Sequence, residues 1–309
     1  MFDIDVVIPM VFPADKEWLK EYDEAAKREH QPWSETRYRS MGLESLQVDL
    51  IKTHMPWVRK IWIILAMPSQ YQDWMRQENV EVVYHHHFIP REYCPAFSAY
   101  TIEMFMHQIK GLAEHFIYFN DDMFPVCHVD ERDFFIGHTA SCTQHVYYPR
   151  IIEFNGNSKN SFWQVCYHSW LMADRHFHLN STRAMLGYGH GPNPMSKSVI
   201  KQAFKENEKE ILDSITTFRS SENLLQYLWC HYCFLGEYEN GMPMGAAADD
   251  DKTMYLSTAL SDELLSKMLA YATDNPYILF LCYNDTDFGL HTEAKRKILT
   301  DYLMKTMEY

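Results

Sequence analysis

The most constraining stretch of the sequence lies at residues 116–124, where a short apolar run leads directly into two adjacent aspartates. The run 116–119 is apolar or aromatic throughout, which predicts a short strand covered on both faces. In open α/β sheets, ligands bind in the crevice at the carboxyl ends of the strands. Asp121 and Asp122 would lie at such an end, where carboxylates hold a hard cation such as Mg²⁺ beside substrate phosphates. The alternative is that one of them only caps the following turn, because Asp is common after a strand.

Strands and helices are expected to alternate along the rest of the chain. β-Branched and apolar runs predict strands, and apolar residues at helical spacing predict helices. The predicted strands are 4–9, 61–66, 80–84, 116–119 and 278–283, and the predicted helices follow Asp15 and cover 43–51, 99–109, 196–217 with Ser196 as N-cap, 224–235, 264–272 and 298–307. This order is typical of a three-layer α/β fold with a largely parallel sheet.

The middle of the chain, from about residue 126 to 193, is less regular and rich in aromatic residues. We expect it to be an insertion in a single domain covering residues 1–309, since no repeat, linker or low-complexity tract divides the chain. Its rings are expected in the core, with stacking on sugar or base faces as the alternative. Near its end, a loop rich in glycine and proline, Gly187–Pro194, presents His190.

The strand predicted at 80–84 ends in three adjacent histidines, His85, His86 and His87. Three histidines suggest a metal site, but neighbours in an extended segment point in alternate directions. At most one of them is therefore expected to reach a site.

The net charge of −14 limits the partners that the protein can bind. General nucleic-acid binding needs a basic stripe that displaces counterions, so the sequence argues against this class of partner. An acidic protein that binds an anionic substrate must do so through individual arginines.

Cysteine usage and hydropathy indicate the compartment. Seven scattered cysteines suit a reducing environment. Cys230 and Cys233 form one C-x-x-C, but they lie in an almost wholly apolar run, so a buried helix is expected rather than half a zinc site. Asp3 and Asp5 interrupt the first apolar run, so no signal peptide is expected, and no run reaches the ~18–20 apolar residues of a membrane-spanning helix. The prediction is a cytoplasmic protein, with peripheral contact at the inner face of the membrane left open.

Four blocks of the sequence, in this order, resemble the Stealth family of bacterial capsule and cell-wall polysaccharide sugar-phosphate transferases. The blocks are Ile4-Asp5-Val6-Val7, the segment from Arg37 to Asp122 that ends in Tyr118-Phe119-Asn120-Asp121-Asp122, His190-Gly191-Pro192 with Arg219 downstream, and Leu281-Cys282-Tyr283-Asn284-Asp285. The resemblance spans most of the chain, and the second block is its most specific part. In the first block the family usually continues with an aromatic-Val-Asp/Asn-Gly stretch, whereas this chain reads Met10-Val11-Phe12-Pro13-Ala14-Asp15.

The resemblance implies a Rossmann-like fold similar to nucleotide-sugar transferases, and an enzyme that transfers a hexose 1-phosphate such as N-acetylglucosamine 1-phosphate. The donor would be a UDP-sugar, the acceptor a hydroxyl of an oligosaccharide or lipid-linked glycan, and UMP would leave. Mg²⁺ or Mn²⁺ would neutralise the phosphate oxygens in such a transfer. The product would enter capsular or exopolysaccharide synthesis.

The matching blocks also imply a ligand set for this cation. Asp122 and Asp285 each follow an apolar strand and are the implied metal ligands, with Asp121 as the spare. Asn120 and Asn284 precede them in the chain and are expected to contact substrate.

The remaining implied site residues bind phosphate or move a proton. Arg219 and Arg39 are candidates for the diphosphate, with Arg37 behind them, because a planar guanidinium matches phosphate oxygens. His190 would take the acceptor proton, since imidazole titrates near neutral pH, or donate a hydrogen bond to phosphate. From the first block, Asp5 and Asp15 carry over as substrate-binding residues.

Two other functions remain open. A metal-dependent glycosyltransferase would share the fold and the carboxylates but release UDP, and Asp285-Thr286-Asp287 offers the Asp-x-Asp pattern typical of that class. A non-catalytic polysaccharide-assembly or binding protein would explain the altered first block, although the retained Asp, Arg and His residues argue against it. The oligomeric state does not follow from the sequence.

Overall fold

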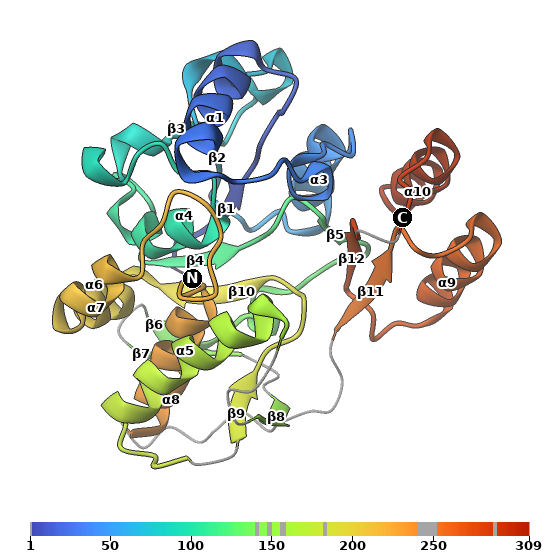
Figure 1. The fold of residues 1–309 in the computed structure, drawn as a ribbon. Helices are drawn as coiled ribbons and strands as arrows, with labels where there is room; N and C mark the ends of the chain where they lie inside the picture. Colours follow the sequence, from blue (N-terminus) through green and yellow to red (C-terminus); the bar gives the residue numbers. More distant parts are fainter. Residues whose placement is uncertain are drawn as a thin grey trace.

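The computed structural model describes residues 2–139, 142–146, 150–154, 159–181, 184–239, 252–286 and 289–308. Its centre is a five-stranded sheet in the order β10-β4-β1-β2-β3 (Figure 1). The strands are β1 (Ile4–Pro9), β2 (Lys60–Leu65), β3 (Val80–Tyr84), β4 (His115–Tyr118) and β10 (Asn193–Ser196). Every pair is parallel except β10 with β4. The predicted mixed α/β fold with a mostly parallel central sheet is therefore confirmed.

The order of the strands creates a crevice between β1 and β4. The chain runs from β1 outward to β2 and β3, and β4 then returns to the opposite side of β1. At such a reversal the connections leave in opposite directions, and ligands bind beyond the carboxyl ends of the two strands. β1 ends at Pro9 and β4 ends just before Asn120, so the turn that carries the two aspartates borders this crevice.

Both faces of the central sheet are covered. One face packs against α4 (Ala99–Phe105), α6 (Lys197–Glu206) and α8 (Tyr227–Glu239), and α5 (Ser161–His176) packs against α8. The other packs against α3 (Glu44–His54). Alternation along β4 shows the two sides, because Phe116 and Tyr118 lie in the first core and Ile117 in the second. The run at 116–119 is fully buried, as predicted for a strand covered on both faces.

A second, smaller sheet has the order β11-β12-β5. It is formed by β5 (Met123–Pro125), β11 (Thr253–Ser257) and β12 (Phe280–Asn284), and the orange and red helices α9 (Asp262–Asp274) and α10 (Glu293–Thr306) lie beside it (Figure 1). β5 starts directly after Asp122, and the Tyr283 N–H of β12 donates to the Asp122 carbonyl at 2.8 Å. The two Asn-Asp segments of the sequence are therefore neighbours in space.

The remaining elements follow β1 or belong to the middle of the chain. α1 (Lys16–Glu29) and α2 (Glu35–Tyr38) come after β1. The middle, expected to be irregular, contains the antiparallel pairs β6 (Phe135–Thr139) with β7 (Cys142–His145) and β8 (Arg150–Glu153) with β9 (Ala184–Gly187), together with α5. Cys230 and Cys233 are buried on α8, as predicted. Within the described ranges, no helix combines the length and apolar character needed to cross a bilayer.

The structure corrects two predictions about one helix, its length and its N-cap. The helix expected at 196–217 is divided at Asn207 into α6 and α7 (Glu208–Asp213). Ser196 does stand at the N-cap position of α6, but its hydroxyl lies 2.9 Å from a ring nitrogen of His115 and of His145 and makes no capping bond. The residue therefore joins β10 to β4 and β7 instead of closing the helix.

Candidate active site

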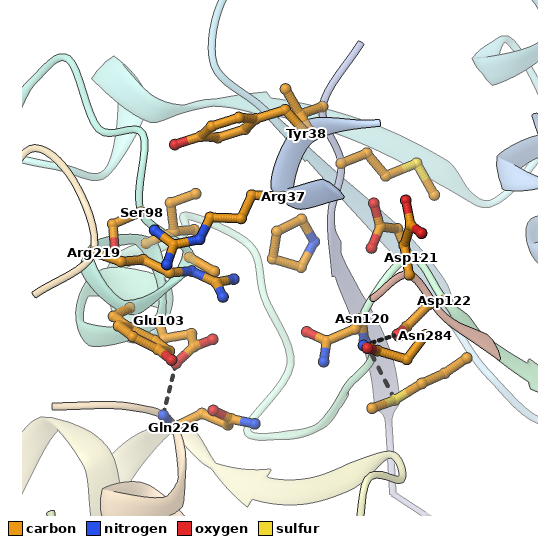
Figure 2. A pocket seen from close by; sticks show the side chains of 18 of the residues that line it. Arg37, Tyr38, Ser98, Glu103, Asn120, Asp121, Asp122, Arg219, Gln226 and Asn284 are labelled. Atoms are coloured by element: carbon orange, nitrogen blue, oxygen red, sulfur yellow. Dashed lines mark hydrogen bonds between the residues drawn. The ribbon is translucent and has the colours of Figure 1, made fainter. Parts of the chain in front are cut away.

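A cavity of about 560 Å³ opens at the carboxyl ends of β1 and β4 (Figure 2). Its wall combines the exit of β1, the turn after β4, the end of β12, the loop that carries His190 and the segment before α8. The predicted site residues in this wall are Arg37, Arg39, Asn120, Asp121, Asp122, His190, Arg219, Asn284 and Asp285. Residues from all but the first of the four sequence blocks thus meet in one place.

The turn that carries the aspartates is fixed from below by α3. Gln47 is fully buried, and its side-chain amide donates to the carbonyl oxygens of Asn120 and Met123, both at 2.7 Å. Tyr118 donates its hydroxyl to the Asn120 side chain at 2.7 Å. The backbone and the first side chain of the turn are therefore held independently of any ligand.

The two oxygens of Asp122 have different surroundings. Oδ2 accepts hydrogen bonds from the Asn284 amide at 3.2 Å and the Cys282 thiol at 3.4 Å. Oδ1 is shielded from solvent and has no hydrogen-bond partner among the described residues. Desolvation raises the pKa of this carboxyl, and the bonds from Asn284 and Cys282 oppose that shift. One oxygen is fixed by the protein, and the other is left for a ligand.

Asp285 shows the same asymmetry. Its Oδ1 accepts the Thr258 hydroxyl at 2.9 Å, whereas Oδ2 receives no hydrogen bond within the described chain and lies 3.4 Å from Nη1 of Arg39. The side chain is only 4% exposed. This is a second carboxylate oxygen without a hydrogen bond on a residue that lines the cavity, and it is a further potential ligand for a cation.

The third carboxylate, Asp121, has a pKa that its surroundings raise. Desolvation, followed by the charges of Asp122 and Glu44, raises its pKa to about 7. Asp121 and Asp122 gather with Asn284 on one side of the cavity (Figure 2).

This acidic side could hold a hard divalent cation. In the part of the chain that the structure describes, no three or more His, Cys, Asp or Glu side chains are arranged to hold an ion alone. Oδ1 of Asp122 and Oδ2 of Asp285, the latter once Arg39 moves away, could supply the protein ligands, and water and substrate oxygens the remainder, as is usual for Mg²⁺.

The opposite side of the cavity is basic and aromatic. Arg37 and Arg219 lie together there, near Ser98 and Glu103 (Figure 2). The guanidinium carbon of Arg219 is 4.9 Å from the ring centroid of Tyr100, which is cation–π geometry. Two guanidinium groups in a partly enclosed space suit an anionic group such as a diphosphate.

Glu103 was not predicted as a site residue. It is 3% exposed, its Oε2 accepts the Gln226 N–H at 2.7 Å, and its Oε1 lies 2.9 Å from the Tyr118 hydroxyl oxygen. Burial raises its pKa to about 7, and the bonds from Gln226 and Tyr118 and the charge of Arg219 only partly oppose this. The signal in the sequence was a lone acid among the apolar residues of the helix predicted at 99–109.

His190 is half-buried between two rings. Its imidazole stacks on Phe162, with ring centroids 5.7 Å apart and planes at 20°, and the Tyr255 ring lies 5.3 Å away. No hydrogen bond to the His190 ring is found among the residues that the structure describes. Of the three adjacent histidines, only His85 lines the cavity, and burial lowers its pKa to about 3.

The two aspartates of the first block lie elsewhere. Asp15 is the N-cap of α1, where it accepts the Trp18 N–H at 2.7 Å, and it borders a neighbouring hollow shared with Arg39. Asp5 is fully buried near the amino end of β1, the end opposite the cavity. The structure does not bring Asp5 to the other predicted site residues. Asp287 lies outside the described residues, so the predicted Asp-x-Asp pattern cannot be placed.

An α/β protein with this acidic and basic cavity has recognisable relatives. Residues 37–143 match Stealth protein CR2, conserved region 2. The chain is 26% identical over 325 residues to the capsular polysaccharide phosphotransferase WcwK of Streptococcus pneumoniae, covering 94% of this chain and 92% of that protein. It is 28% identical over 229 residues to the capsular polysaccharide phosphotransferase cps1A of Actinobacillus pleuropneumoniae, covering 72% of this chain and 62% of that protein.

A further relative is the capsular polysaccharide phosphotransferase eps5J of Streptococcus thermophilus, at 34% identity over 139 residues, which is 43% of this chain and 58% of that protein. These matches support a relationship between this chain and the Stealth family. The chain's matches to cps1A and eps5J span about three fifths of the length of those relatives.

Proposed function

We propose that the protein is a sugar-phosphate transferase that moves a hexose 1-phosphate from a UDP-sugar to a hydroxyl of a glycan acceptor, in capsular or exopolysaccharide synthesis. The names of the relatives, all polysaccharide phosphotransferases, support the class of reaction. One observation links the proposal to this cavity: Asp122, whose Oδ1 has no hydrogen-bond partner among the described residues, lines the same cavity as His190 and Arg219.

In the proposed reaction, one bond to the β-phosphorus forms and one breaks. The acceptor oxygen attacks the β-phosphorus, the bond from that phosphorus to the bridging oxygen of the diphosphate breaks, and UMP leaves. The acceptor proton passes to the unprotonated ring nitrogen of neutral His190. Bound Mg²⁺ or Mn²⁺ would neutralise phosphate charge, which is most of what such a transfer requires besides positioning.

The protein's own groups would orient the reactants. Arg219 and Arg37 would bind diphosphate oxygens, while Tyr100 holds the Arg219 guanidinium by its ring face. Arg39 is paired with Asp285 and would move between that carboxylate and the donor. Asn120 and Asn284 border the acidic turn and would contact substrate, and Asn284 also fixes Asp122.

The finer description of the fold belongs to the same proposal. The order β3-β2-β1-β4 matches the first four positions of the 3-2-1-4-5-6 order of a Rossmann sheet, that is, one mononucleotide-binding half and the strand that follows the reversal. The donor nucleotide would lie beyond the carboxyl end of β1, where Pro9, Met10 and Val11 line the cavity. We also place the protein in the cytoplasm, where a lipid-linked glycan would meet it at the membrane face.

The nucleotide product tests this function. The purified protein would be incubated with UDP-N-acetylglucosamine and other UDP-hexoses, Mg²⁺ or Mn²⁺ and a pool of oligosaccharides. Formation of UMP that needs both metal and acceptor is the expected result. Formation of UDP would mean attack at the anomeric carbon and would replace the proposal with a glycosyltransferase. Neither nucleotide, with tight binding of the oligosaccharides, would indicate a binding protein.

His190→Ala adds a check on the proposed base. If His190 takes the proton, turnover should fall by roughly 10²–10⁴-fold. A nearly normal rate would assign this role to another group.

A further inference from the structure

The imidazole of His190 is the middle ring of a row of three rings from distant parts of the chain: it stacks on Phe162 and is tilted by 40° from the ring of Tyr255. Phe162 comes from the first turn of α5, whose N-cap Asn160 accepts the Phe162 N–H at 2.9 Å. Tyr255 comes from the centre of β11. Phe162 lines the cavity with His190, whereas Tyr255 stands outside its wall. The three rings therefore extend from the cavity to the protein surface.

The strand pattern of β11 turns the Tyr255 ring outward. Met254 and Leu256 are buried on one side of the strand, and alternation places Tyr255 on the other, where it is 48% exposed. The core therefore does not need this ring, although a large apolar surface costs free energy when it stays in water.

The position of Tyr255 is tied to the acidic turn and to the His190 loop. In the sheet, Tyr255 is directly opposite Cys282, whose thiol contacts Asp122. The His190 loop lies on the same face of β11, because a Cβ added to Gly191 would come within 2.4 Å of the Thr253 hydroxyl. The exposed ring therefore has a fixed place beside the proposed base and one strand away from the proposed metal ligand.

We propose that Tyr255 is the platform on which a sugar ring of the acceptor stacks, so that an acceptor hydroxyl reaches His190. This inference rests on the proposed function. A pyranose has a face of C–H groups, and these are attracted to the negative face of an aromatic ring. An acceptor that hydrogen-bonds to the edge of His190 must lie beside the three rings, and Tyr255, with its ring centroid 5.3 Å from that of His190, offers the exposed surface there. Stacking depends on the C–H face more than on the pattern of hydroxyls, so the platform accepts the carbohydrate class and leaves the choice of hydroxyl to the polar groups around it.

The test compares Tyr255→Ala with Tyr255→Phe, which keeps the ring. Tyr277→Ala is the matched control, because Tyr277 is a 73% exposed tyrosine placed just before β12 of the same small sheet. Saturation-transfer NMR with maltotriose, cellotriose and triacetylchitotriose would report binding without any donor or turnover. We expect transfer to ring C–H protons of the trisaccharides in the wild type, in Tyr255→Phe and in Tyr277→Ala, and roughly 5- to 30-fold weaker binding in Tyr255→Ala.

Turnover gives a second readout. The acceptor KM should rise by a similar factor in Tyr255→Ala, with the affinity for UDP-sugar unchanged. Equal trisaccharide binding by the wild type and Tyr255→Ala would overturn the platform, as would absence of transfer to every trisaccharide. Release of UDP in place of UMP would overturn the proposed function and leave the NMR result standing, so the two failures are distinguishable.

Discussion

Asp5 and Asp122 are both shielded carboxylates beside strands of the molecule, yet their surroundings are opposite. The Asp5 carboxylate accepts two bonds from the Arg59 guanidinium at 2.8 and 2.6 Å, and bonds from the Trp62 indole and the Ala113 N–H, both at 2.8 Å. Asp122 accepts bonds at Oδ2 alone and leaves Oδ1 unused among the described residues. A buried charge that is fully paired stabilises a fold, whereas a partly paired one is a place for a ligand.

The largest effect on turnover is expected at Asp122 and Asp285, whose carboxylates each keep one oxygen that accepts no hydrogen bond among the described residues. Asp122→Asn and Asp285→Asn should each lower metal-dependent turnover by roughly 10³-fold or more, because a metal ligand contributes several kcal/mol to transition-state stabilisation. The free energy of unfolding should change by no more than about 1 kcal/mol, since Oδ1 of Asp122 has no hydrogen-bond partner among the described residues and Oδ2 of Asp285 makes only the 3.4 Å ion pair with Arg39. Product release would be measured by chromatography and stability by urea denaturation.

Asp274→Asn is the control for these variants, because Asp274 is an exposed aspartate at the end of α9. Full activity in Asp122→Asn or Asp285→Asn would remove that carboxylate from the mechanism.

The second prediction concerns Asp5, whose two carboxylate oxygens both accept hydrogen bonds from the protein. Asp5→Asn should destabilise the protein by about 3 kcal/mol, because it leaves the Arg59 charge uncompensated and places an amide group against two N–H donors. Urea denaturation would measure the loss, and UDP-sugar binding of the folded fraction should match the wild type. A variant of normal stability that no longer binds the donor would reverse the roles of the two aspartates.

Cys282 gives a smaller effect that sharpens the comparison at Asp122. Cys282→Ala removes one of the two donors to Oδ2 and should weaken Mn²⁺ binding roughly 10-fold, as loss of an outer-sphere partner of a metal ligand commonly does. Cys282→Ser keeps a donor and should bind Mn²⁺ nearly as well as the wild type. Equal affinities in both variants and the wild type would show that Asn284 alone orients Asp122.

The last prediction concerns Glu103, whose effect on the free energy of unfolding depends on pH. Its pKa in the folded protein, about 7, lies above the usual value of 4.5, so the folded state holds its proton more tightly than the unfolded chain. The stability that Glu103 contributes is therefore fully present below about pH 4.5 and is lost as the pH rises towards 7. Glu103→Gln should be more stable than the wild type by roughly 3 kcal/mol at pH 8 and nearly equal to it below pH 4.5. A constant difference across this range would contradict the raised pKa.

The sequence allowed the strands β1 to β4, the buried run at 116–119 and the acidic turn to be predicted, because each depends on local periodicity. The sequence predicts a loop rich in glycine and proline at 187–194, whereas the structure places Asn193 and Pro194 in β10, an edge strand where proline is tolerated. The roles of Asp5 and Glu103 could not be predicted because they depend on long-range partners. Asp5 resembles a site residue until Arg59 and Ala113 surround it, and Glu103 becomes part of the cavity only through Tyr118, Gln226 and the nearby Arg219.

The most direct test of the central claim is Mn²⁺ binding followed by electron paramagnetic resonance in the presence of UDP-N-acetylglucosamine. The wild type and the folded fraction of Asp5→Asn should show the signal of protein-bound Mn²⁺, and Asp122→Asn should show mainly the signal of the free ion. Wild-type Mn²⁺ binding by Asp122→Asn would contradict the claim that the unused oxygen of Asp122 is where the catalytic metal binds.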